Sequence, residues 1–115
     1  MKILTNRAGA YLTGDDIADA VLQYGAALAN EQRVDLVDIP YVRTDDHGSV
    51  GTVRLSVGWQ IEVNAAHHPS EGVELIDHPV LMELSTRARS LHPSGDTPLT
   101  PDDIAFLDEM EDYDL

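Results

Sequence analysis

Three histidines lie close enough in the sequence to be considered as ligands of one metal ion. His67 and His68 are adjacent, and His78 follows Asp77 further along the chain. Imidazole and carboxylate groups bind zinc and other divalent metals. Adjacent residues of an extended segment point in opposite directions, however, so His67 and His68 rarely bind one metal together. We therefore predict no metal site, and keep a small-molecule or metal-binding domain or enzyme that uses His67, His68 and His78 as the alternative function.

A second group of residues has the side chains for general acid–base catalysis. His47 follows Asp45 and Asp46, and a carboxylate beside an imidazole can orient it as a base. The segment has the composition of a turn, and a turn lacks the concave wall that excludes water from a catalytic site. The sequence also contains no P-loop, no HExxH motif and no GxSxG motif. We predict no catalytic residue and no cofactor, and an enzyme is the less favoured interpretation.

The charge of the chain restricts its partners more than any motif does. Twenty-one acidic and seven basic side chains give the 115 residues a formal net charge of −14. Such a field repels nucleic acids and anionic lipid surfaces, so we expect neither as a direct partner. A basic protein surface would be attracted, although acidity that serves only solubility explains the same composition. The absence of cysteine, of a secretory signal and of a membrane-spanning apolar run favours a cytoplasmic protein.

The first long helix is predicted over residues 13–31. Thr13 is expected to be its N-cap, followed by two aspartates at the positive end of the helix dipole. Apolar residues cover a wide arc, so this helix should contact both a sheet and a second helix, in the same chain or in another copy. Small residues at Gly25 and Ala29 would allow a close approach. The predicted homodimer interface consists of Leu22, Gly25, Ala29 and Trp59.

Two strands are predicted to form a hairpin after this helix. Residues 34–42 are rich in β-branched side chains, and a turn containing Gly48 leads to the second strand. Apolar and polar residues alternate from Val53 to Val63 without a break at Gly58, which predicts one long strand bent at this glycine. A loop with an odd number of residues at Gly58 is the alternative. A strand of this length would leave an unpaired edge for another subunit.

The side chains of this hairpin suggest one core residue and one ion pair. Trp59 lies on the apolar side of the alternation, which predicts a core aromatic, while its residue type is also typical of interface hot spots. Arg43 and Arg54 are expected on the polar side. Pairing of these two arginines with Glu62 or with nearby aspartates is favoured over an anion-binding site.

Shorter elements flank the hairpin and the first helix. We expect a short strand at residues 3–4, a loop at 65–72 and another short strand at 73–76. Asp77 is predicted to cap a second helix that runs to Leu91, with Glu83 four residues before Arg87. The core-facing residues of this helix are expected to be Val80, Leu81, Leu84, Ala88 and Leu91.

The last part of the chain contains acidic residues but no basic ones. Residues 93–98 have the composition of a linker, and residues 99–115 predict an amphipathic helix with an acidic face. The predicted partner-binding residues are Ile104, Phe106, Leu107, Met110 and Tyr113, together with Asp102, Asp103, Asp108 and Glu109. The alternative is that the apolar stripe docks on its own domain. A free segment predicts an unchanged thermal midpoint when residues 96–115 are removed, and a docked one predicts a lower midpoint.

These patterns predict an α+β fold with an N-terminal helix, a small antiparallel sheet built on a long hairpin, and two C-terminal helices. Residues 1–92 should form a compact domain, followed by the linker 93–98 and the acidic helix 99–115. The favoured function is a non-enzymatic interaction module, a homo-oligomer that binds a basic protein surface. An inhibitor that mimics the charge of nucleic acid would be a more specific form of this function.

Overall fold

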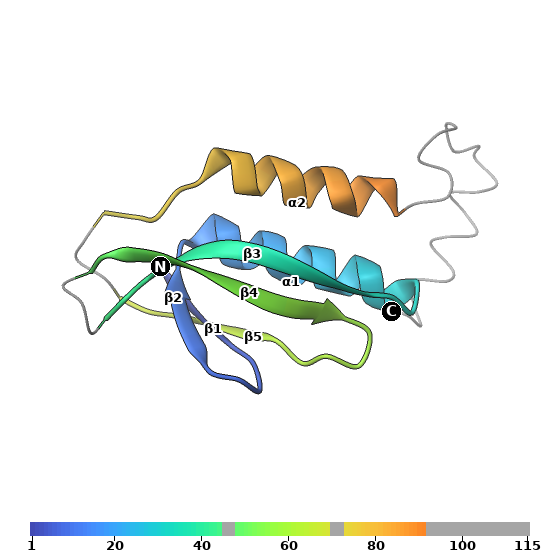
Figure 1. Cartoon of the computed structure of the whole chain (residues 1–115), viewed down its shortest axis with the longest axis horizontal. Coiled ribbons are helices and arrows are strands. Elements are labelled where there is room, and N and C mark those ends of the chain that lie inside the picture. Colours follow the sequence, from blue (N-terminus) through green and yellow to red (C-terminus); the bar gives the residue numbers. More distant parts are fainter. Residues whose placement is uncertain (45–47, 70–72, 92–115) are drawn as a thin grey trace.

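The strands and helices form one antiparallel sheet with both helices on the same side (Figure 1). The computed structural model describes residues 1–44, 48–69 and 73–91. The elements are β1 (Lys2–Thr5), β2 (Ala10–Thr13), α1 (Asp15–Asn30), β3 (Val34–Val42), β4 (Val50–Gly58), β5 (Asn64–His67) and α2 (His78–Ser90). The strand order is β4-β3-β2-β1-β5. The α+β class is confirmed, while the predicted linker 93–98 and helix 99–115 lie outside the described residues.

A hairpin precedes the first helix, which corrects the prediction that the fold opens with a helix. Strand β1 extends the short strand predicted at residues 3–4, but β2 was not predicted. The side chain of Asn6 accepts hydrogen bonds from the N–H groups of Ala8 and Gly9, at 2.8 and 3.0 Å. An asparagine that binds its own following backbone favours a tight turn, which joins the two strands.

Thr13 is the last residue of β2 and not the N-cap of α1, so that prediction was wrong. The N-cap is Gly14, which provides no side-chain hydrogen bond. The hydroxyl of Thr13 is fully buried and donates to the carbonyl oxygen of Pro40 in β3 at 2.9 Å. Strands β2 and β3 share a single paired position, Leu12 with Val42, so this hydrogen bond reinforces a short junction.

The long bent strand predicted through Gly58 does not form, because β4 ends at this residue. Five residues, 59–63, then lead to β5 at the opposite edge of the sheet, so the strands on either side of Gly58 do not form a hairpin. Strand β5 pairs with β1, from Lys2 opposite His67 to Thr5 opposite Asn64. The loop predicted at 65–72 therefore begins too early, and the short strand predicted at 73–76 is absent.

The predicted hairpin forms, but its second strand, β4, runs from Val50 to Gly58 and does not continue to Val63. The two strands pair over their full lengths, from Val34 opposite Gly58 to Val42 opposite Val50. Arg54 lies opposite Asp38 and its Nε donates to the carboxylate at 2.7 Å, so the predicted pairing with a nearby aspartate is correct.

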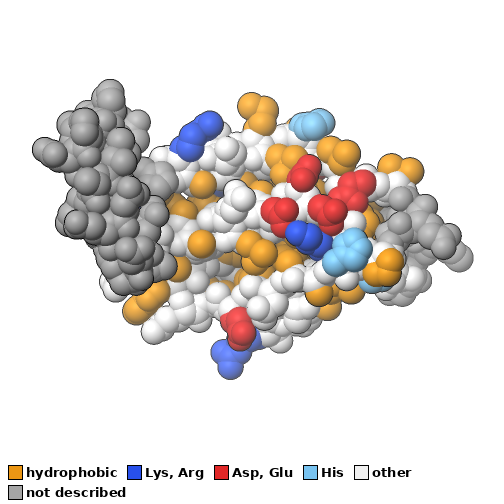
Figure 2. All heavy atoms as spheres, turned by 180° about the vertical axis from the view of Figure 1, so that it is seen from behind, with side chains coloured by type: hydrophobic (Ala, Val, Ile, Leu, Met, Phe, Trp, Pro, Cys, Tyr) orange, Lys and Arg blue, Asp and Glu red, His pale blue; other side chains and the backbone are white. Residues whose placement is uncertain are grey.

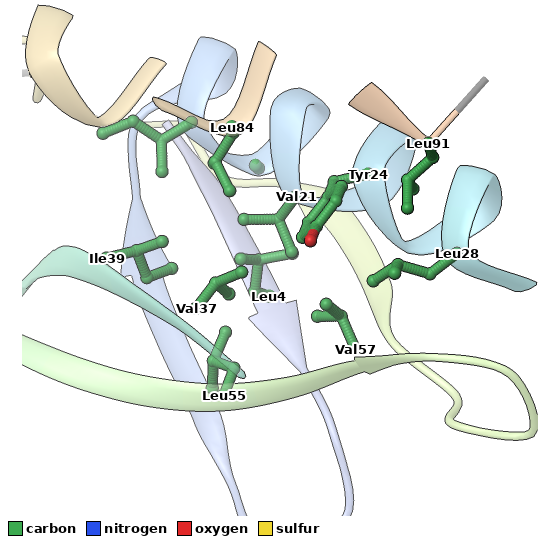
Figure 3. Close-up of a cluster of buried hydrophobic side chains, with 12 residues drawn as sticks. Leu4, Val21, Tyr24, Leu28, Val37, Ile39, Leu55, Val57, Leu84 and Leu91 are labelled. Carbon is green, nitrogen blue, oxygen red and sulfur yellow. The ribbon is translucent and has the colours of Figure 1, made fainter. Parts of the chain in front are cut away.

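The core lies between the sheet and the two helices (Figure 3). Helix α1 lies within its predicted range of 13–31 but begins only at Asp15, and its buried residues are Ile17, Ala18, Val21, Tyr24 and Leu28. These side chains meet Val37, Ile39, Leu55 and Val57 from the hairpin and Leu4 from β1. At about 1.5–3 kcal/mol for each large apolar side chain, this burial is the main driving force of folding.

Helix α2 packs on α1 and closes the core from above in the view of Figure 1. The carboxylate of Asp77 accepts the Val80 N–H at 3.2 Å, which confirms the predicted cap. Leu84 and Leu91 are buried, and the ion pair of Arg87 with Glu83 forms as expected. The register of the strands places Ile3, Leu12 and Val42 together on the face of the sheet opposite to the two described helices.

We expect replacement of Thr13 by valine to lower the free energy of unfolding by about 1–2 kcal/mol, because the buried Pro40 carbonyl loses its partner. Thr13→Ser should retain the hydrogen bond. Thr52→Val is the matched control, since Thr52 is an exposed strand residue. Urea denaturation measures the three variants. Equal stability of the Thr13→Val and Thr52→Val chains would contradict the role of the hydroxyl.

Candidate functional site

An apolar groove open to solvent lies between α1 and the segment that follows β4. Its volume is about 180 Å³. It is lined by Val21, Leu22, Gly25, Ala26, Ala29, Val57, Gly58, Ile61 and Val63. Figure 2 shows hydrophobic side chains across the middle of one face of the molecule. Sites for small organic ligands usually measure roughly 300–1,000 Å³, so this groove is suited to one or two apolar side chains of a polypeptide.

Small residues on α1 create one wall of the groove. Gly25 and Ala29 lie one turn apart on the same side of the helix. A Cβ atom built on Gly25 would have ordinary contacts, 3.7 Å from Val57 Cβ and 3.8 Å from Gly58 N. The helix is therefore close to the end of β4, while the missing side chain leaves space beside it.

A tight backbone turn creates the opposite wall. Gly58 has a φ of +125°, and the N–H of Trp59 donates to the carbonyl oxygen of Arg33 at 2.9 Å. Gln60 also has a positive φ, of 62°, and the N–H of Ile61 donates to the Gly58 carbonyl at 3.1 Å. This turn brings Ile61 and Val63 to the groove.

Three of the four residues predicted for a dimer interface meet in this groove. Leu22, Gly25 and Ala29 line it together. Trp59 follows Gly58 directly but does not line the groove, and it is 42% exposed, so its predicted place in the core was wrong. Sequence reasoning missed the contribution of Ile61 and Val63. Their apolar alternation was visible, but it was assigned to a continuous strand.

A basic residue lies at one end of the groove. The carbonyl of Arg33 would be only 2.3 Å from a Cβ on Gly58, so its backbone is in close contact with a lining residue. The Arg33 side chain is exposed and forms no ion pair with a described residue. An exposed basic residue is therefore joined through its backbone to the lining of the groove.

Two acidic side chains near the start of α1, Asp15 and Asp19, are paired with cations. The ammonium group of Met1 lies 2.9 Å from Glu74 Oε1 and 3.0 Å from Asp15 Oδ1, and Lys2 Nζ lies 2.7 Å from Asp19. Hydrogen bonding to Glu74, then to Asp15, raises the pKa of the ammonium, whose hydrogen bond in turn lowers the pKa of Asp15. Figure 2, which views the molecule from the side opposite to Figure 1, shows acidic side chains gathered around a basic one. These ion pairs join the start of the chain to α1 and to the segment before α2.

A second network joins both helices to the sheet. The hydroxyl of Tyr24 donates to Asp35, and Arg87 contacts the same carboxylate at 3.2 Å and the Leu36 carbonyl at 3.0 Å. The hydrogen bond from Tyr24 is the main reason that the pKa of Asp35 is lowered. Burial, followed by this hydrogen bond, raises the pKa of Tyr24.

A polar cavity of about 230 Å³ lies between α2 and the hairpin. Its charged lining residues are Arg54, Arg87, Asp38 and Glu83. Each arginine is paired with a carboxylate, so the cavity presents little net charge to a ligand. The alternative function placed a ligand near three histidines. His67, His68 and His78 line neither this cavity nor the groove.

Histidine and carboxylate side chains do not converge on a metal-binding arrangement in residues 1–44, 48–69 and 73–91. The catalytic pair considered at His47 lies outside the described residues, as do all nine predicted partner-binding residues between Asp102 and Tyr113. The chain matches no known family model, and comparisons with curated proteins and with solved structures also find no match. Neither described helix is long and apolar enough to cross a membrane.

We expect Gly58→Ala to destabilise the protein by about 2 kcal/mol or more, because the new Cβ meets the Arg33 carbonyl in a backbone conformation that favours glycine. Gly48→Ala is the matched control. Gly48 also has a positive φ, of 78°, but a Cβ there has no neighbour within 4 Å. Denaturant titrations of both variants isolate the close contact at Gly58. Equal losses in the two variants would contradict this contact.

We expect Tyr24→Phe to cost about 1 kcal/mol at pH 7, the typical contribution of one intramolecular hydrogen bond. Asp35 has a folded-state pKa below its ordinary 3.8, so its ionisation stabilises the fold above pH 3.8. That contribution disappears as the pH falls through the lowered pKa, and the effect of Tyr24→Phe should shrink with it. Tyr41→Phe, which removes a hydroxyl without a described hydrogen bond, is the control. Stability curves from pH 7 to pH 2 measure the difference, and a pH-independent loss in Tyr24→Phe would contradict the coupling.

Proposed function

We propose that this chain is a non-enzymatic, cytoplasmic protein-interaction module that binds a basic partner protein. The observation that carries the proposal is the groove, which is open to solvent, too small for most cofactors, and lined by apolar residues alone among those that the structure describes. Such a groove is suited to the side chains of a polypeptide. The paired carboxylates and arginines elsewhere support binding over catalysis, because their charges are neutralised by one another.

The distribution of charge supports a basic partner. All seven basic residues occur before residue 90, whereas residues 96–115 carry eight of the acidic residues and no basic one. The acidity of the chain is therefore concentrated at one end of the sequence. We infer that Asp102, Asp103, Asp108 and Glu109 attract the partner, beside the apolar residues Ile104, Phe106, Leu107, Met110 and Tyr113.

The same surface is consistent with assembly into homodimers. Leu22, Gly25 and Ala29 line the groove, and exposed Trp59 follows the lining residue Gly58. Tryptophan is frequent among interface hot spots, and small helix residues permit close packing of two helices. A dimer would present two acidic segments to one partner and increase its affinity through bivalent binding.

The experiment compares charge neutralisation at two places in the chain. One variant carries Asp103→Asn, Asp108→Asn and Glu109→Gln, and the matched control carries Asp16→Asn, Glu31→Gln and Glu62→Gln. The tagged proteins are used to capture partners from a cell extract, and the affinity for each captured protein is then measured at increasing salt concentration. We expect the first variant to weaken binding at least about tenfold and the control to have a much smaller effect, because the attraction is local and screened beyond about 10 Å. Binding that is insensitive to both salt and the first variant would contradict the proposal.

A further inference from the structure

We propose that the groove between α1 and the loop after β4 binds the C-terminal segment of the same chain, residues 99–115. This inference rests on the proposed function, because it identifies what the groove holds while the acidic segment attracts a partner. The apolar side of the segment would lie in the groove and its acidic side would face solvent. A groove filled in this way is closed to a second copy, so this arrangement replaces the homodimer interface at Leu22, Gly25 and Ala29, and the mixture described below distinguishes the two.

The position of Leu91 places the segment within reach of the groove. Leu91 is buried and belongs to the same core cluster as Leu28 of α1 (Figure 3). The neighbour of Leu28 in the chain, Ala29, lines the groove. The chain thus leaves the described domain near the half of α1 that forms the groove. Residues 92–103 span up to about 40 Å when extended, which exceeds the roughly 24 Å length of α1.

The composition of the segment matches the lining of the groove. Phe106 is the only phenylalanine of the chain, and Met110 follows it by four residues. Side chains four residues apart lie on one side of a helix, so these two can enter an apolar groove together. A volume of about 180 Å³ accommodates such a pair partly, with the remaining stripe residues covering the rim.

The charges at this end of the domain are complementary to the segment. The backbone of Arg33 contacts Gly58 of the groove, its side chain is exposed without an ion pair to a described residue, and exposed Arg89 lies in the last turn of α2. The segment brings acidic residues only. Exposed ion pairs contribute little affinity, about 0–1 kcal/mol each, so the apolar contacts should provide the binding and the arginines its orientation.

The absence of cysteine allows a direct test with a single spin label. A nitroxide is attached to Asp112→Cys in the full chain, and methyl signals are recorded by NMR. We expect the signals of Leu22, Ile61 and Val63 in the groove to be broadened. The signals of Leu12 and Val42, on the face of the sheet opposite to the two described helices, should keep their intensity and show that the domain is folded. Equal intensities at both places would overturn the proposal.

Two variants and one mixture complete the experiment. Gly25→Leu fills the groove from the helix side and Phe106→Ser removes the largest apolar side chain of the segment, and each should restore the groove signals. An equimolar mixture of isotope-labelled chains without a nitroxide and nitroxide-labelled chains without isotopes should show no broadening. Broadening in the mixture would assign the groove to the segment of a second copy and overturn binding within one chain. Salt-dependent capture of a partner by the unlabelled chain is measured separately. The NMR experiment thus tests what the groove binds, and the capture experiment tests the proposed function, so each can fail without the other.

Discussion

The two parts of the sheet are joined through one short junction, and the shape of the molecule depends on it. Leu12 and Val42 are the single pair between β2 and β3, and the buried hydroxyl of Thr13 adds a hydrogen bond to Pro40. Because this ladder is short, the hairpin of β3 and β4 runs in a direction different from that of β1 and β2 (Figure 1). Helix α1 covers both parts, and the loop 59–63 connects β4 with β5 at the other edge. The groove lies where helix and loop meet.

The helices are held on this sheet by two kinds of interaction. Apolar burial is the larger one, since α1 provides five buried residues and α2 adds Leu84. The network of Tyr24, Asp35 and Arg87 fixes the relative orientation of α1, β3 and α2, because its hydrogen bonds form only in one arrangement of these elements. Polar contacts of this kind favour one arrangement over similar packings that bury the same area.

Local patterns in the sequence were sufficient to predict α1, α2 and the β3–β4 hairpin, because each is specified by neighbouring residues. Asp77 and Glu83 acted as their spacing indicates. The sequence around Thr13 was misleading, since a threonine before two aspartates resembles a helix cap whether its hydroxyl binds locally or reaches another strand. The alternation of apolar and polar residues through Gly58 was equally ambiguous. It continues across the five-residue loop after β4, so the same pattern fits a continuous strand and an interrupted one.

The candidate site was predicted in part for the same reason. Leu22, Gly25 and Ala29 belong to one helix, so their shared side follows from helical periodicity. Ile61 and Val63 reach the groove through the turn at Gly58 and through the pairing of β5 with β1. Contacts between residues so distant in the sequence leave no local pattern. Trp59 is an example. Its residue type and its place in the apolar alternation both favoured the core, but the backbone turn after Gly58 leaves its side chain exposed.

The position of β1 within the sheet has a consequence for synthesis on the ribosome. This strand pairs with β2 at once, but its other neighbour, β5, is translated only after the β3–β4 hairpin. During that interval one side of β1 exposes unpaired N–H and C=O groups, which are a template for contacts with other nascent chains. The sheet is completed late, when β5 pairs with the distant β1. This pairing loses chain entropy, which is compensated only once the core has formed.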